Sequence, residues 1–114
     1  MRKLVIKIWN RTLLLLGKID VDYVVISKRP ISLKLKAKQV TFVGSENFYK
    51  WAIMKCPCGC GDILSLSLMK TYSPNWIAKI DSKDRVTLSP SVWKNDGCCS
   101  HFFIKKGKII WAID

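Results

Sequence analysis

The chain has 114 residues, 49% of them hydrophobic, which is enough for one domain with a core and too little for two ordinary domains. Its 20 Lys and Arg outweigh 8 Asp and Glu. The resulting formal net charge of +12 favours an acidic partner such as nucleic acid, an anionic membrane surface or an acidic protein face. This composition excludes a wholly disordered chain, and we expect a single domain over residues 1–114.

No segment of the sequence is apolar enough to cross a membrane. The longest uncharged apolar run, 12–17, is far shorter than the roughly 20 residues that a spanning helix needs. Lys7 and Arg11 interrupt the apolar residues near the start, which is unlike a secretory signal. We therefore expect a cytoplasmic protein.

The first part of the chain, 1–44, is basic and is expected to form strands. It holds ten Lys or Arg and two acids. Leu33–Lys38 alternates apolar and cationic residues with the period of two that is typical of a strand with one solvated face. We interpret its lysines as a solvated edge rather than as phosphate ligands. Further strands are expected at 3–9, 21–27 and 40–43, and a short helix at 12–16.

The second part, 45–114, consists of short apolar runs separated by turn residues. Gly107 can supply the positive φ that a tight turn between the last two runs requires. The fold expected is mainly β, a small antiparallel meander or sandwich-like domain with at most short helices. The strands expected in this part are 51–54, 63–68, 76–80, 85–88, 101–105 and 108–113.

Five cysteines form two clusters that are typical of a metal site. Three of them alternate with Pro57 and Gly59 in the run 56–60, and two lie at 98–99. Glycine lets the backbone curl around an ion, and the second cluster can supply ligands from another direction. Nothing in the sequence implies an oxidising compartment, so metal binding explains this clustering better than disulfides do. We predict a structural Zn²⁺ site in the second part of the chain.

Six side chains compete for the four places around the ion. If residues 98–103 are extended, Cys98 and Ser100 share one face while Cys99 and His101 share the other. His101 or Cys99 remains the alternative fourth ligand. The favoured set is Cys56, Cys58, Cys60 and Cys98.

A second site is suggested by the lone histidine. His101 is the only side chain here whose unperturbed pKa lies near neutrality, and Ser91 would face it if the strand after Arg85 pairs with the strand after Ser100. A Ser–His pair within hydrogen-bond reach is the start of an acyl-transfer site. The alternatives are that His101 is a metal ligand or core residue and that Ser91 is a turn hydroxyl. The five tryptophans, at 9, 51, 76, 93 and 111, are interpreted as core packing rather than as base-stacking residues.

Five motifs follow one another in the second part of the chain: Cys-Pro-Cys-Gly-Cys-Gly at 56–61, Pro-Ser-Val-Trp at 90–93, Gly-Cys at 97–98, Ser-His-Phe-Phe-Ile at 100–104 and Gly-Lys-Ile-Ile-Trp at 107–111. In this order they resemble a family of small bacterial proteins known as a domain of unknown function. The resemblance covers most of the chain from about Lys50 onward. Members of that family often place a cysteine where this chain has Ala112; if that cysteine is a ligand elsewhere, Cys99 or His101 takes its place here or the site differs.

The resemblance implies a role in a bacterial ubiquitin-like pathway. Genes of family members often lie next to genes for ubiquitin-like proteins and for their activating and conjugating enzymes. The resemblance also implies that Ser91, Ser100 and His101 are catalytic candidates. Our leading hypothesis is a zinc-stabilised component of a bacterial ubiquitin-like modification pathway, either its processing peptidase or acyl-transfer enzyme, or an accessory binding part. The alternative is a non-enzymatic basic module that binds nucleic acid or an acidic protein.

Overall fold

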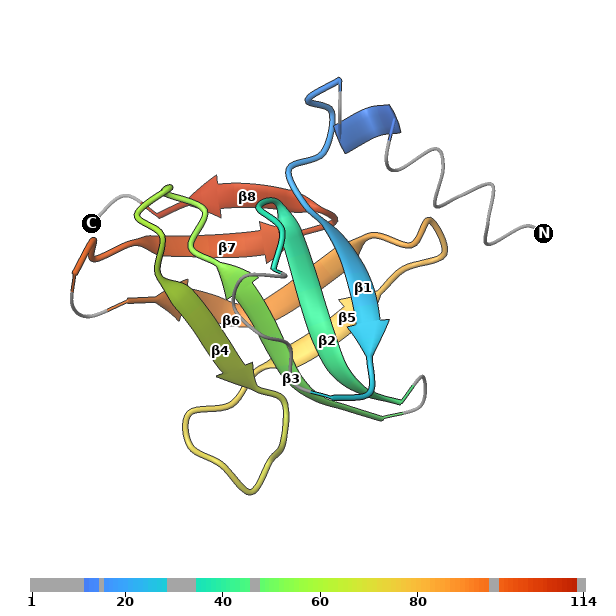
Figure 1. The fold of residues 1–114 in the computed structure, drawn as a ribbon, viewed down its shortest axis with the longest axis vertical. Coiled ribbons are helices and arrows are strands. Elements are labelled where there is room, and N and C mark those ends of the chain that lie inside the picture. The colour runs from blue at the N-terminus through green and yellow to red at the C-terminus, as the bar shows by residue number, and fades with distance from the viewer. Residues whose placement is uncertain (1–11, 15, 29–34, 46–47, 95–96, 113–114) are drawn as a thin grey trace.

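Two four-stranded sheets pack face to face in the computed structural model, which describes residues 12–14, 16–28, 35–45, 48–94 and 97–112. Figure 1 shows sheet A in front of sheet B, with the strands of the two sheets crossing. Sheet A has the order β1-β2-β3-β4 and sheet B the order β5-β6-β7-β8. The strands are β1 (Asp22–Ile26), β2 (Gln39–Ser45), β3 (Phe48–Lys55), β4 (Ile63–Ser67), β5 (Ile77–Ile80), β6 (Val86–Trp93), β7 (His101–Lys105) and β8 (Lys108–Trp111).

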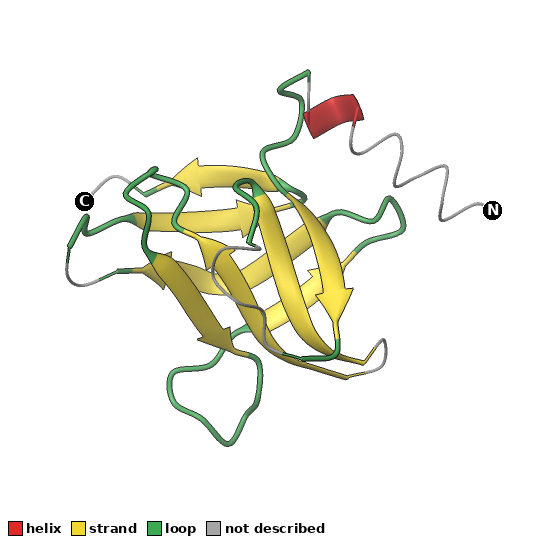
Figure 2. Cartoon of the chain, in the orientation of Figure 1, coloured by secondary structure: helices red, strands yellow, loops and turns green. Residues whose placement is uncertain are grey.

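The mainly β fold expected from the sequence is confirmed. All strand pairs are antiparallel except β1 and β2, which run parallel and are joined through 27–38. Among the described residues, helix is limited to a short turn at 12–14, within the helix expected at 12–16 (Figure 2). The expected division of the chain at residue 44 falls inside β2, so both parts contribute to sheet A.

Apolar residues from both sheets form one core between them. Alternate residues of each strand point inward, as the period of two requires. Phe42 of β2, Met54 of β3 and Phe102 of β7 are among the largest fully buried side chains. A smaller cluster of Leu35, Val43 and Ile53 forms separately from this core. The outward-facing residues of sheet B have no such covering layer among the described residues, which leaves that face open.

Two expectations about local structure are wrong, and one lies outside the described residues. The part of Leu33–Lys38 that is described is coil and turn, because Lys38 adopts φ 61° where the chain bends into β2. Trp93 and Trp111 are exposed rather than core residues, since β6 presents Trp93 on the open face and Trp111 lies on the edge strand β8. The strand expected at 3–9, which includes Trp9, lies outside the described residues.

β6 is longer than the run 85–88 expected for it because it continues past Pro90 through a bulge. Leu88 pairs with Ile104 and Val92 pairs with Phe102, so three residues of β6 lie opposite one residue of β7. A bulge of this kind re-aims the side chains beside it. Ser91 lies in the bulge, directly before the register of β6 and β7 resumes.

Candidate functional site

The first cysteine cluster lies in the connection from β3 to β4, which turns tightly on its own backbone. The amide of Cys56 donates to the carbonyl of Asp62 at 2.8 Å, and the amide of Gly59 donates to the carbonyl of Cys56 at 3.2 Å. Gly59 and Gly61 have φ of 89° and 88°, a region that side chains with a Cβ rarely adopt. The alternation of cysteine with these glycines therefore brings the sulfurs to one side of the turn.

Four sulfurs meet at this turn, and they come from the two clusters. The Cys56 Sγ lies 3.4 Å from the Cys58 Sγ and 3.6 Å from the Cys98 Sγ, and the ligand atoms of Cys56, Cys58, Cys60 and Cys98 all lie within 4.8 Å of one another. Four sulfurs at about 2.3 Å from one Zn²⁺ would be about 3.8 Å apart. The donor set and its spacing therefore fit a tetrahedral thiolate site, and these are the four residues favoured from the sequence.

The four thiols differ in how readily they ionise. Burial raises the pKa of Cys56, whereas the Ser100 hydroxyl lowers the pKa of Cys98 to about 6 and also lowers that of Cys58. The backbone of Asp62 lowers the pKa of Cys60, but the Cys58 thiol, desolvation by burial and the Cys98 and Cys56 thiols together outweigh it and raise the value to about 12. Sulfurs this close compete for negative charge, and a bound cation is what allows all four to be thiolates.

Two segments carry the clustered cysteines, a first arm at 56–62 and a second arm at 97–100, and the second is fixed against the first by its own contacts. The amide of Lys94 donates to the carbonyl of Ser100 at 2.8 Å, and the Lys94 ammonium forms a 2.7 Å salt bridge with Asp62 of the first arm. Cys99 has φ 53°, and its thiol donates to the carbonyl of Gly97. The extended conformation expected for 98–103 therefore begins only at His101, and this turn, rather than strand alternation, keeps Cys99 out of the four-sulfur group.

Ser100 lies with the sulfurs and not with the histidine that follows it. Its buried hydroxyl is 3.1 Å from the Cys98 Sγ and 3.6 Å from the Cys56 Sγ. Toward ionised sulfur a hydroxyl is a hydrogen-bond donor. This geometry fits a role in stabilising the thiolates.

Replacing Ser100 with alanine should weaken metal binding without affecting the residues on the opposite face of β7. Loss of an outer-shell hydrogen bond lowers metal affinity by about 10- to 100-fold. We expect that decrease in competition titrations of Ser100→Ala with a chromogenic zinc chelator. Ser89→Ala, an exposed serine on β6, is the matched control and should bind zinc like the wild type. Equal affinity of both variants would contradict this role.

Ser91 and His101 meet on the open face of sheet B. The Ser91 Oγ lies 2.8 Å from the His101 Nε2, and both residues are partly buried. The Trp76 indole N–H donates to the Ser91 carbonyl at 3.2 Å, which holds the bulged backbone. The Trp93 ring stacks on the imidazole, with centroids 5.0 Å apart and planes at 14°. The sequence predicts a contact between Ser91 and His101 only if their strands pair. β6 and β7 do pair, and the contact is present.

This arrangement suits nucleophilic catalysis at a carbonyl group. A histidine nitrogen within hydrogen-bond reach can take the proton of a serine hydroxyl as the serine attacks. His101 cannot serve the cysteine site at the same time, because it points to the opposite side of β7 from Ser100. Trp93 and Phe103, which contact the imidazole, were not singled out as site residues. The signal that could have found them is the alternation His-Phe-Phe, which puts Phe103 on the same face as His101.

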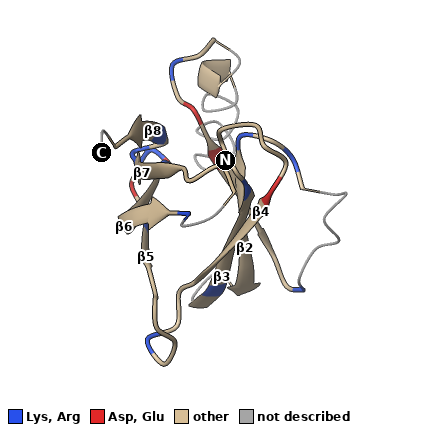
Figure 3. Ribbon diagram, turned by 90° about the vertical axis from the view of Figure 1, so that its left-hand side faces the viewer, with Lys and Arg blue, Asp and Glu red and all other residues tan. Residues whose placement is uncertain are grey.

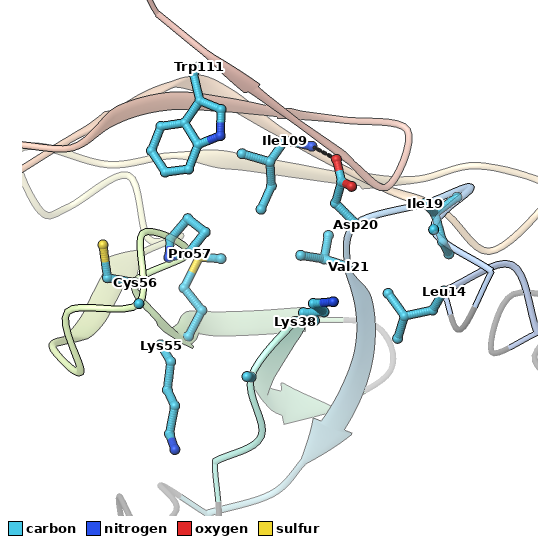
Figure 4. A pocket seen from close by; sticks show the side chains of 14 residues that line it. Leu14, Ile19, Asp20, Val21, Lys38, Lys55, Cys56, Pro57, Ile109 and Trp111 are labelled. Atoms are coloured by element: carbon cyan, nitrogen blue, oxygen red, sulfur yellow. Dashed lines mark hydrogen bonds between the residues drawn. The ribbon is translucent and has the colours of Figure 1, made fainter.

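A cavity of about 480 Å³ lies beside the cysteine turn on the inner side of β8 (Figure 4). Trp111 and Pro57 border it at one end and Leu14 and Ile19 at the other, and the Ile109 amide donates to Asp20 at 2.7 Å. Trp111 pairs with the inward-pointing Phe102, whereas His101 points outward. The cavity is therefore separate from the Ser–His pair, which lies on the open face of sheet B.

The comparisons with known proteins identify one family. The family model described as "Bacterial ubiquitination-like system serine protease (BubE)" matches residues 27–112, a span that includes both cysteine clusters, Ser91 and His101. No curated protein and no solved structure matches the chain. Within the described residues, no helix has the length and apolar character needed to span a membrane.

Proposed function

Because the chain belongs to the BubE family of bacterial ubiquitination-like system serine proteases, we propose that it is a cytoplasmic peptidase that processes a ubiquitin-like protein. In this proposal Ser91 is the nucleophile and His101 is the general base. The four clustered cysteines bind a structural Zn²⁺. The partners are the ubiquitin-like protein and the enzymes that conjugate it.

The observation that carries the proposal is the 2.8 Å contact between the Ser91 Oγ and the His101 Nε2 on an open face. Ser100, the other serine candidate, has its hydroxyl among the sulfurs. A nucleophile must reach both its base and the substrate carbonyl, and of the two only Ser91 contacts the imidazole nitrogen.

The chemistry follows from that contact. The Ser91 oxygen attacks the carbonyl carbon of the scissile bond while its proton passes to the His101 Nε2. The carbon–nitrogen bond then breaks, and His101 donates that proton to the departing amine. Water next attacks the acyl-enzyme ester and gives its proton to His101, which returns one to the Ser91 oxygen as the ester bond breaks. The products are a free carboxylate and a free amine.

The cysteine site contributes to this chemistry by holding the segment that leads into β7, the strand that carries His101. When bound, Zn²⁺ supplies a cross-link between the turn at 56–60 and the arm that contains Cys98. Ser100 is the last residue of that arm and directly precedes His101, so the cross-link would fix the start of β7. The residues of this chain then hold the imidazole in place through the stacked Trp93 ring and the paired β6.

A ubiquitin-like precursor with a carboxyl-terminal extension tests the proposal. We expect the protein to remove the extension, seen as a smaller precursor by intact-mass spectrometry. A fluorophosphonate probe should form a covalent ester with the Ser91 oxygen and release fluoride, whereas the exposed Ser89 should remain unmodified. An intact precursor together with an unlabelled Ser91 would exclude the peptidase. Binding to duplex DNA that falls with salt at a slope of about −0.9 per phosphate contacted would then favour the nucleic-acid module.

A further inference from the structure

Several large apolar side chains around the Ser–His pair are exposed on the outward side of sheet B. The exposed fractions are 59% for Trp93, 42% for Phe103, 48% for Ile110 and 56% for Ile77. These residues come from all four strands of the sheet. Large exposed apolar patches with a polar surround mark binding surfaces, because leaving such area in water is unfavourable.

The residues of this face change in character along the strand direction. On β7 the outward residues are His101, Phe103 and Lys105, because Phe102 and Ile104 between them are buried. The partner strand repeats the order, since Ile110 lies opposite Phe103 and Lys108 opposite Lys105. The His101 and Phe103 ring centroids are 6.0 Å apart. Reactive, apolar and cationic positions thus follow one another at the two-residue repeat of a strand, roughly 6.7 Å.

Lysines at the cationic end of this face repel each other, which lowers the stability of the fold. Lys105 and Lys108 are directly opposite each other in an antiparallel pair, and like charges in that position are destabilising. Lys79 of β5 extends the cationic end at the other side of the sheet. All three lysines are exposed, and Figure 3 shows basic residues at β7 and β8. A carboxylate placed between Lys105 and Lys108 would relieve their repulsion.

We infer that this face binds an extended segment of the substrate with an apolar side chain about two residues, and an acidic side chain about four residues, from the scissile bond. An extended peptide lying along β7 points every second side chain at the sheet, so its repeat matches that of the surface. The apolar side chain packs against Phe103 and Ile110, and the carboxylate contacts Lys105 and Lys108. This inference rests on the proposed peptidase function and specifies its substrate.

A library of internally quenched decapeptides tests the inference with the full-length, zinc-loaded protein. Among cleaved peptides, Leu, Ile, Val or Phe should be enriched two residues from the cut, and Asp or Glu four residues from it on the same side. Charge reversal at Lys105 and Lys108 (Lys105→Glu with Lys108→Glu) should lower kcat/KM for the acidic peptides by about tenfold and favour basic ones instead. The matched control, Lys36→Glu with Lys70→Glu, changes exposed lysines elsewhere and should leave the preference unaltered.

Binding to a catalytically inactive variant separates failure of this inference from failure of the proposed function. Fluorescence anisotropy of labelled peptides with Ser91→Ala should show tighter binding of the apolar-acidic peptides, and Phe103→Ser with Ile110→Ser should abolish that difference. Cleavage without the preference would overturn the inference and leave the peptidase. Preferential binding without cleavage would keep the surface and exclude the peptidase. Tighter binding of a single-stranded oligonucleotide than of any peptide would also overturn the inference.

Discussion

Replacing Ser91 with alanine is expected to lower the rate of precursor cleavage at least about 10³-fold, because no other described serine hydroxyl is in contact with the imidazole of His101. His101→Ala should lower it by a similar factor. The double variant should be no worse than either single one, since residues that act as a unit have non-additive effects. Rates are measured under single-turnover conditions with the extended precursor.

Two serine controls make this result specific. Ser89→Ala alters the same strand and the same face, and should keep wild-type activity. Ser100→Ala should cleave at the wild-type rate when it is saturated with zinc, because its hydroxyl contacts sulfur rather than the imidazole. Thermal melting checks that Ser91→Ala remains folded. Full activity of Ser91→Ala with an inactive, zinc-loaded Ser100→Ala would instead make Ser100 the nucleophile.

Removing the metal is expected to destabilise the protein severely. Structural zinc sites contribute about 10–16 kcal/mol in small zinc peptides, which is comparable to the roughly 5–15 kcal/mol stability of a whole domain. Even part of that loss should lower Tm by more than about 10 °C. Native mass spectrometry should show one zinc per chain, and a strong chelator should produce the decrease in Tm during differential scanning calorimetry.

The two cysteines of the second arm provide a matched pair for this experiment. Both are exposed, but Cys98 belongs to the four-sulfur group, whereas the neighbouring Cys99 is bonded only locally to Gly97 in the described contacts. Cys98→Ser should lose zinc and stability together, and Cys99→Ser should keep both. A metal-free protein with unchanged Tm, or equal zinc loss in both variants, would mean that the cysteines do not hold a structural ion.

Much of the fold could be predicted because its information is local. Strands β3 to β8 alternate inward and outward residues or end in turn residues, and both features are visible in the sequence. The parallel pairing of β1 with β2 was not predictable in this way. The direction of pairing depends on where 27–38 leads the chain, and a run such as Asp22–Ile26 carries no mark of it.

The alternation in Leu33–Lys38 was misleading for a related reason. A period of two is compatible with a strand, but it does not require one, and the positive φ of Lys38 converts the end of this run into a turn. Trp93 was assigned to the core because apolar surroundings in sequence do not show which face of a sheet is covered. Only the packing of the two sheets shows that sheet B has an open side.

The candidate site was predictable in part from chemistry. Cysteine density identified the group of sulfurs, but the face alternation expected for an extended 98–103 does not apply before His101, because 97–100 is turn and coil and Cys99 has φ 53°. The contact between Ser91 and His101 required the pairing of β6 with β7 and the bulge that the sequence marks only by Pro90. The apolar and cationic positions on the open face of sheet B come from several paired strands. No single run of residues in the sequence therefore indicates them.

Ser100 and His101 are consecutive residues whose side chains point in opposite directions from one backbone. Only Cys99 and Ser100 separate the proposed ligand Cys98 from the proposed base His101. A shift of Cys98 on loss of a bound ion would therefore reach His101 within three residues of chain and alter its contact with Ser91. The two proposed roles, holding an ion and positioning a base, are thus mechanically coupled through one short turn.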